Sequence, residues 1–214
     1  MRPQEYPSDR PVLSFEEWLD IRTGKGEATE IPNHLELDHF ETRPTYAEYV
    51  VRTWEDPIGL LVGKGSLNQL GETLYREWAV NTDTRLSSPL RDRAWQAFPN
   101  LFTRIFAQYC SPVLGHLSES NPTTERLDAA CYMWWEVHWI PYDDERFFRL
   151  METCLATSHP AVQESALHGL GHAEYDKSAR RHVHRIIDRF LQSNNAARPE
   201  LVRYAKSARR GHVL

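Results

Sequence analysis

Long apolar stretches are missing from this 214-residue chain, and their absence limits where the protein can work. A membrane-spanning helix needs roughly 20 mostly apolar residues, and no run of the sequence approaches that length. The first fifteen residues, MRPQEYPSDRPVLSF, are polar and carry prolines, unlike the apolar centre of a secretory signal. We therefore expect a cytoplasmic protein that does not engage a membrane.

Cysteine is also scarce, and a phosphate-binding loop is absent. The three cysteines lie far apart in apolar surroundings and form no CxxC pair, which argues against a disulfide framework or a zinc knuckle. The stretch GLLVGKGSLNQL, residues 59 to 70, has three residues between its glycines where a P-loop needs four. In addition, Gly65 separates the lysine from the serine, so we interpret this stretch as a glycine-rich turn.

A surplus of positive charge is missing as well. The chain has 30 acidic and 25 basic residues, a net charge of -5 that argues mildly against a protein that coats phosphate backbones. Basic residues gather in segments 177 to 185 and 203 to 214, where they could touch an acidic partner or nucleic acid, or form the solvated face of the last helices. Nucleic acid is therefore not the expected main partner.

What the sequence does contain is a series of helix-start signals. Ser14 to Glu17, Thr45 to Glu48 and Ser66 to Gln69 match the capping box. Prolines 89, 122, 160 and 199 stand where a first helical position tolerates them. Strand-like alternation hardly occurs, so the sequence predicts an all-α protein. Residues 23 to 44 hold no sustained period and are expected to form an irregular loop.

A repeat of 36 residues organises the second half of the chain. Ala130, Cys131, Trp134, Leu150 and Leu155 recur as Ala166, Leu167, Leu170, Ile186 and Leu191. A period of this size is typical of stacked helical hairpins. One step earlier, Ala94 and Phe98 match Ala130 and Trp134, although the second helix of that unit aligns poorly.

The segment HPAVQESALHGLGHAEYDKSARRHVHRIIDRFLQS, residues 159 to 193, resembles a HEAT-like repeat. A proline opens its first helix, a small residue and a leucine lie at its centre, and a second amphipathic helix follows. The resemblance is clear for residues 121 to 193 and implies an α-solenoid, a fold used mostly as a binding scaffold. We expect a single domain over 1–214, with N-terminal helices and loops over 1–87 and HEAT-like repeats over 88–214.

Two histidines four residues apart raise the question of a metal site. His168 and His172 share a helix face with Glu164, almost opposite the apolar stripe of the same helix. Zinc needs three or four ligands, and the HExxH signature is absent because Gly169 follows the first histidine. We therefore expect no metal ion and no cofactor, and a solvated or partner-facing histidine pair.

The same 36-residue offset predicts three parallel rows of polar side chains on one surface. These polar rows and their aromatic neighbours are the candidate partner-binding residues: Asp92, Gln96, Asn100, Asp128, Tyr132, Trp135, Glu136, His138, Glu164, His168 and His172. Tryptophan and tyrosine are enriched at binding hot spots, which favours Trp135 beside Glu136 and His138. If the rows line the concave face they would grip a partner, and if they line the outer face they are a solvated surface.

The function that these features favour is non-enzymatic. A small acidic domain without a covalent-catalysis signature fits an inhibitor or immunity protein that neutralises a toxin, and we expect no catalytic residues. One alternative comes from Trp134-Trp135-Glu136, which is similar to the aromatic and acidic site of HEAT-like DNA glycosylases that excise alkylated bases. The aspartate expected in such a site is missing here. A metal-dependent hydrolase is a further alternative.

Overall fold

The computed structural model describes residues 13–23, 44–75, 80–137, 140–193 and 198–213. Within these ranges every regular element is helical and no strand occurs, which confirms the all-α prediction. The elements are α1 (Phe15–Thr23), α3 (Pro44–Glu55), α4 (Pro57–Leu61), α5 (Leu67–Tyr75), α6 (Ser88–Ala97), a π-helical turn η1 (Leu101–Phe106), α7 (Ala107–Tyr109), a 3-10 turn η2 (Gly115–Leu117), α8 (Glu125–Tyr132), α9 (Trp134–Val137), α10 (Glu145–Leu155), α11 (Pro160–Ala173), α12 (Arg180–Ser193) and α13 (Pro199–Ala208).

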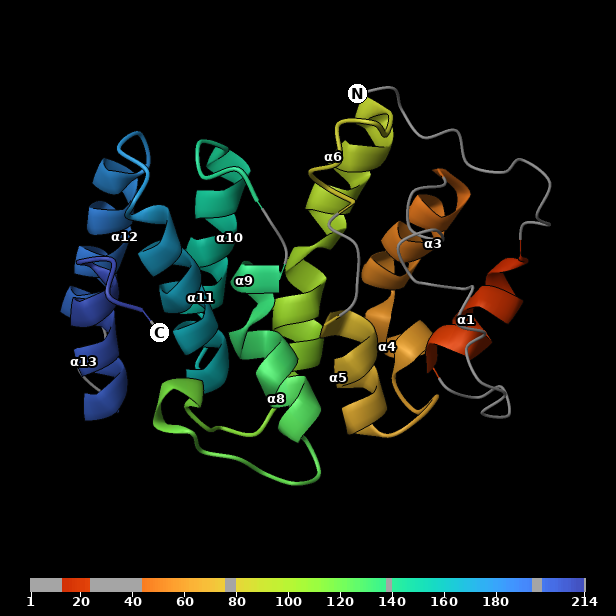
Figure 1. Ribbon diagram of the computed structural model, residues 1–214, viewed down its shortest axis with the longest axis horizontal. Helices are drawn as coiled ribbons and strands as arrows, with labels where there is room; N and C mark the ends of the chain where they lie inside the picture. Colours follow the sequence, from red (N-terminus) through yellow and green to blue (C-terminus); the bar gives the residue numbers. More distant parts are fainter. Residues whose placement is uncertain (1–12, 24–43, 76–79, 138–139, 194–197, 214) are drawn as a thin grey trace.

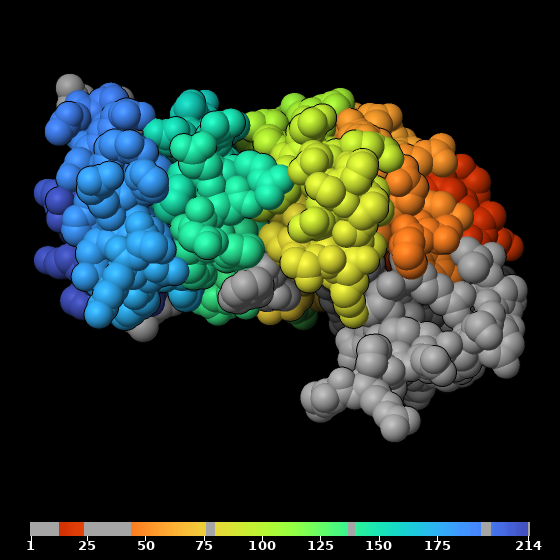
Figure 2. Space-filling view, turned by 90° about the horizontal axis from the view of Figure 1, so that it is seen from above, coloured from red at the N-terminus to blue at the C-terminus, as the bar shows by residue number. Residues whose placement is uncertain are grey.

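The helices form an elongated array that follows the chain from one end of the molecule to the other. In Figure 1, α1 and α3 lie at one end, α5, α6 and α8 in the middle, and α12 and α13 at the other end. The space-filling view shows the same progression along the long axis (Figure 2). No helix in the described part of the chain combines the length and apolarity that a bilayer crossing requires.

Helix starts agree with the sequence signals at most positions. Ser14 and Glu17 form a reciprocal capping box, in which the Ser14 amide donates to the Glu17 carboxylate at 2.8 Å and the Glu17 amide donates back to the Ser14 hydroxyl at 3.3 Å. The corresponding pair at residues 66 and 69 does the same, with distances of 2.8 and 3.1 Å. The prolines at 89, 160 and 199 open α6, α11 and α13, as predicted.

Two predicted starts were wrong. Helix α3 begins at Pro44, so Thr45 lies inside the helix, and Glu48 instead pairs with Arg93 at 2.6 Å. Helix α8 begins at Glu125, three residues after Pro122. The irregular loop expected over residues 23 to 44 lies outside the described residues except at its two ends, which belong to α1 and α3.

A continuous hydrophobic core runs the length of the array, and aromatic rings fill its centre. Trp134 packs against Phe98, Phe102 and Phe106, with ring centroids 5.7 to 5.9 Å apart. Trp135 stacks on Phe102 at 5.3 Å with an interplanar angle of 14°. Such pairs contribute about 0.5–1.5 kcal/mol each beyond the burial of their area. The rings therefore hold the end of α6, η1 and α9 against one another.

Close backbone approach tightens the same region. Helix α5 packs against α8, and a Cβ atom added at Gly71 would lie 2.3 Å from the backbone of Arg126 and Leu127. Only glycine fits such a contact, because real Cβ atoms do not approach other heavy atoms so closely. This packing positions α8 in the middle of the array, where it meets α11.

Candidate functional site

Helix α11 carries Glu164, His168 and His172, three of the residues that the sequence singles out, and it is enclosed by other helices. It packs against α8, α9, α10, α12 and α13, so neighbours cover it on several sides. Glu164 is 1% exposed and His168 is fully buried. The expectation that these side chains face solvent or a partner was therefore wrong. The amphipathic pattern of α11 alone does not reveal that α13 covers its polar side.

The contacts between α8–α9 and α11 nevertheless follow the 36-residue offset. The ring of Tyr132 lies 4.5 Å from the ring of His168. One row further, Glu136 Oε1 lies 3.6 Å from His172 Nε2. The offset was used to place these residues side by side on a surface, but they meet at a partly buried helix interface.

The first of the three predicted polar rows, on and after α6, does not lie at this interface between α9 and α11. Asp92 accepts a hydrogen bond from Arg146 at 3.0 Å, and Gln96 is exposed. The side-chain amide of Asn100 donates to the Trp54 carbonyl at 2.9 Å, toward α3. The offset therefore fails for the polar side of α6, where the π-helical turn η1 follows instead of a regular second helix.

Trp135 does not form an exposed aromatic contact surface. It is 4% exposed, and its indole nitrogen donates to Ser165 Oγ at 3.0 Å. Its ring also fills the space above Gly169, where an added Cβ would lie 2.8 Å from the ring. Thus the predicted binding role of Trp135 was wrong, and the residue instead packs α9 against α11. His138 lies outside the described residues.

Glu136, His168 and His172 converge at this packed interface. His168 Nε2 lies 2.9 Å from Glu136 Oε1 and 3.1 Å from His172 Nε2. Among the residues that the structure describes, these three form the one group of histidine, cysteine or carboxylate side chains that could hold a metal ion. Helix α8 ends at Tyr132 and α9 starts at Trp134, and this break directs Glu136 toward α11.

Tyr204 of α13 completes the histidine cluster from the far side. Its hydroxyl lies 2.6 Å from His168 Nδ1 and 3.3 Å from the Tyr132 hydroxyl. Burial raises the pKa of Tyr204, so the phenol stays protonated at neutral pH. Burial, and next the nearby charge of His172, lower the pKa of His168 to about 4. Hence His168 is a neutral imidazole at pH 7.

Sequence reasoning missed Tyr204 although a signal for it existed. Tyr132, His168 and Tyr204 follow one another at intervals of 36 residues. The segment that resembles a HEAT-like repeat ends at residue 193, before α13 begins at Pro199. Continuing the same offset would have placed a tyrosine beside His168.

Glu164 lies one turn before His168 and holds the loop between α7 and α8. Its carboxylate accepts from the backbone amides of Gly115 and His116, at 2.6 and 3.1 Å. It also contacts Nδ1 of the His116 ring, and that ring stacks on Tyr204 with centroids 4.4 Å apart. Three donors therefore compensate the burial of this carboxylate.

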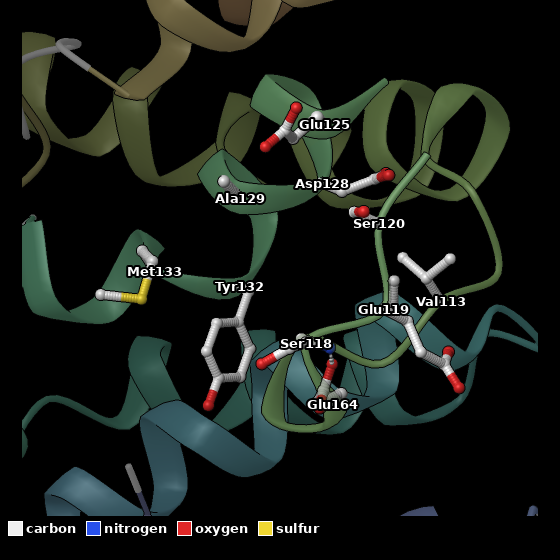
Figure 3. Close-up of a pocket in the computed structure, with 12 residues that line it drawn as sticks. Val113, Ser118, Glu119, Ser120, Glu125, Asp128, Ala129, Tyr132, Met133 and Glu164 are labelled. Atoms are coloured by element: carbon white, nitrogen blue, oxygen red, sulfur yellow. Dashed lines mark hydrogen bonds between the residues drawn. The ribbon is translucent and has the colours of Figure 1, made fainter. Parts of the chain in front are cut away.

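Beside this loop lies an acidic hollow of about 260 Å³ (Figure 3). Its carboxylates come from the loop, α8 and α11, and its apolar wall comes mainly from α8 and the loop. The lining residues are Val113, Gly115, Ser118, Glu119, Ser120, Glu125, Asp128, Ala129, Tyr132, Met133, Ala161 and Glu164. Sequence reasoning named Asp128, Tyr132 and Glu164 but missed Glu119 and Glu125, because the loop position of Glu119 follows no helical period.

The charges in the acidic hollow are unevenly compensated. Arg198 lies 2.8 Å from Glu119, and together with the Leu114 amide it lowers the pKa of that carboxyl. Among the described residues, Asp128 accepts hydrogen bonds from two neutral donors, the Ser111 amide at 2.9 Å and the Thr124 hydroxyl at 2.8 Å. Glu125 is exposed. The acidic hollow therefore carries net negative charge toward solvent.

Comparisons of this chain with protein-family models, with curated proteins and with solved structures find no match, so the functional argument depends on the residues themselves.

Proposed function

We propose that this chain is a HEAT-like helical-repeat protein that binds another protein by receiving a basic side chain of that partner in the acidic hollow. The observation that carries the proposal is a hollow of about 260 Å³ lined by four carboxylates. Arg198 already pairs with Glu119, and three donors engage Glu164. In contrast, Asp128 and Glu125 have no ion-pair partner among the described residues. A lysine or arginine side chain has an apolar stem and a cationic head. Its stem would lie along Ala129 and Met133, and its head would meet Asp128 and Glu125.

The repeat part of this proposal rests on the register of three helices. Helices α8, α11 and α13 lie next to one another in that order, and each contributes one aromatic residue at a spacing of 36 residues to the same hydrogen-bonded row. Equivalent side chains in a row are what stacked repeats produce. The acidic hollow opens beside this row, on the loop that precedes α8.

The concrete form of the proposal is an inhibitor or immunity-type protein that neutralises a toxin. Inhibitors of this kind work by covering an active cleft, and a toxin that acts on a phosphate backbone needs a basic one. The net charge of -5 and the acidic hollow support such a pairing by electrostatic complementarity. The proposal includes a cytoplasmic location for the protein and a toxin as its partner.

The glycosylase alternative loses the observation that motivated it. Trp134 is 1% exposed and Trp135 is 4% exposed, so neither indole offers a face on which a nucleotide base could stack. Glu136 does reach the surface, with 34% of its side chain exposed, but it faces His168. No described feature around it favours base excision.

The test is a charge reversal at the exposed rim of the acidic hollow. The variant Glu125→Lys should weaken binding of a synthetic lysine- and arginine-rich peptide on the order of tenfold, about 1.4 kcal/mol. The matched control is Glu16→Lys, which makes the same charge change on an exposed residue of α1. Fluorescence anisotropy at low and high salt measures both, because screening should weaken only an electrostatic contact.

A second arm applies the same pair of variants to partner capture from cells that produce the protein. A protein that is enriched near stoichiometry on the native chain and on Glu16→Lys, but lost on Glu125→Lys, supports the proposal. If the peptide binds both variants equally, or if the captured proteins are the same for both, the acidic hollow is not the contact surface.

A further inference from the structure

Three potential ligand atoms lie unusually close together at the junction of α9 and α11. His168 Nε2 is 2.9 Å from Glu136 Oε1 and 3.1 Å from His172 Nε2, and the third side of this triangle is 3.6 Å. This cluster is separate from the acidic hollow, since none of its three residues lines that cavity.

The size of the triangle suits a metal ion. Bonds from zinc to histidine nitrogen and carboxylate oxygen are about 2.0–2.2 Å long, which puts neighbouring ligand atoms of a tetrahedral site roughly 3.3–3.6 Å apart, close to the sides of this triangle. A circle through the three atoms has a radius of about 1.9 Å, so an ion roughly 1 Å above their plane would reach all three at bonding distance. The side chains already lie where coordination would hold them.

One proton on the His168 ring cannot link all three ligand atoms. A neutral imidazole has one N–H group. If His168 Nε2 carries it, the bond can go to Glu136 or to His172, but not fully to both. If Nδ1 carries it and donates to Tyr204, the Nε2 lone pair faces a carboxylate lone pair. A single cation at the centre of the triangle would satisfy all three atoms at once.

The surroundings supply the outer interactions that metal-binding histidines usually have. A ligating histidine almost always donates its other ring nitrogen to an oxygen, which fixes its tautomer and orientation. His168 Nδ1 has that partner in the Tyr204 hydroxyl at 2.6 Å, and the Tyr132 ring packs on its face at 4.5 Å. Its fully buried ring is therefore held in one orientation before any ion arrives.

Solvent reaches two of the three side chains of the cluster. The side chains of Glu136 and His172 are 34% and 30% exposed, whereas His168 is buried. An ion could enter from solvent past these two residues. Three protein ligands also leave at least one coordination position for water, which is the arrangement of catalytic rather than structural zinc sites.

Contrary to the expectation from the sequence, we propose that Glu136, His168 and His172 bind one divalent transition-metal ion of the zinc class. Two imidazoles and one carboxylate suit zinc and its first-row neighbours. Calcium and magnesium prefer sites made entirely of oxygen atoms, and no thiolate is present for softer ions. The 36-residue offset pairs Glu136 with His172, but only the packing of α9 on α11 brings its carboxylate within reach of both histidines.

The test is metal titration of the full chain, purified without a polyhistidine tag and stripped with a chelator. We expect one zinc ion per chain, and a cobalt-substituted form whose visible absorption reports nitrogen and oxygen ligands. His172→Ala and Glu136→Gln should each weaken binding at least about tenfold, because each removes one of three ligands. Tyr204→Phe should weaken it by about 10–100-fold through the lost outer interaction.

The chain has 10 histidines, so adventitious binding needs a matched control. His184→Ala provides it, because His184 is 32% exposed and lies 3.3 Å from a carboxylate, Glu174, without a second histidine ligand. The control should bind zinc as the native chain does. The proposal is overturned if the native chain binds no ion, or if binding survives both His172→Ala and Glu136→Gln. Both substituted side chains are partly exposed, and circular dichroism verifies that each variant is folded.

Discussion

Replacing Glu164 by glutamine tests whether the polar side of α11 is a structural interior or a surface. The carboxylate is 1% exposed and holds the loop before α8 through the Gly115 amide, the His116 amide and the His116 ring. Glutamine has the same shape but only one acceptor oxygen. Its amide group would present hydrogens to backbone donors that need an acceptor.

The size of the effect follows from these contacts. A hydrogen bond to a charged group contributes about 1.5–3 kcal/mol, and an unsatisfied buried donor costs about 1–3 kcal/mol. One carboxylate oxygen of Glu164 is lost as an acceptor in Glu164→Gln, while removal of the buried charge gives back part of its desolvation cost. We expect a loss of about 2–3 kcal/mol in the free energy of unfolding.

Urea unfolding followed by circular dichroism measures this loss, with Glu125→Gln as the control. Glu125 borders the same acidic hollow but is exposed, so its change should stay within about 0.5 kcal/mol. Hydrogen exchange at Gly115 and His116 should accelerate only in Glu164→Gln. If both variants are equally stable and exchange is unchanged, the carboxylate is not the buried support of this loop and the reasoning fails.

Further predictions address packing, pH and thiol chemistry. Gly169→Ala should cost about 1–2 kcal/mol in thermal or urea unfolding, because the new Cβ would lie 2.8 Å from the Trp135 ring and overpacking outweighs the gain in helix propensity. An unchanged stability would show that α9 can move away freely. Burial lowers the pKa of His159 below its unfolded value, so its contribution to stability is complete above about pH 6.5 and is lost as pH falls further; His159→Gln should therefore flatten the decline in urea midpoint between about pH 7 and pH 5, and an unaltered slope would contradict this. All three cysteines are buried, and they should react with a thiol reagent only after unfolding, whereas rapid labelling of the native chain would indicate an open core.

The helical elements were largely predictable because their signals are local. A capping box needs two side chains three residues apart, and both the Ser14 and the Ser66 examples form as the sequence indicates. Thr45 failed because Pro44 already fits the first helical position, and the helix starts there. A capping-box signal therefore predicts that a helix begins nearby, and the neighbouring residues determine the residue at which it begins.

The candidate site depends less on local signals than the helices do, and more on tertiary packing. The 36-residue offset predicted that Tyr132 lies beside His168 and Glu136 beside His172, and both contacts occur in the structure. The period could not state that another helix covers the row. Burial of His168 and Glu164 depends on α13 and on the loop before α8, and neither element is encoded in the amphipathic pattern of α11.

The sequence by itself determined that the described chain is helical and where most of its helices begin, and its 36-residue offset anticipated two contacts of α8 and α9 with α11. The tertiary structure decided which side of α11 is solvent and which is interior. It also brought Glu136 to the two histidines. The chain breaks at Met133 between α8 and α9, and Gly169 lets the Trp135 ring of α9 pack closely on α11. Local free energies specify an element, but the environment of a side chain is set by whatever packs across from it, often more than thirty residues away.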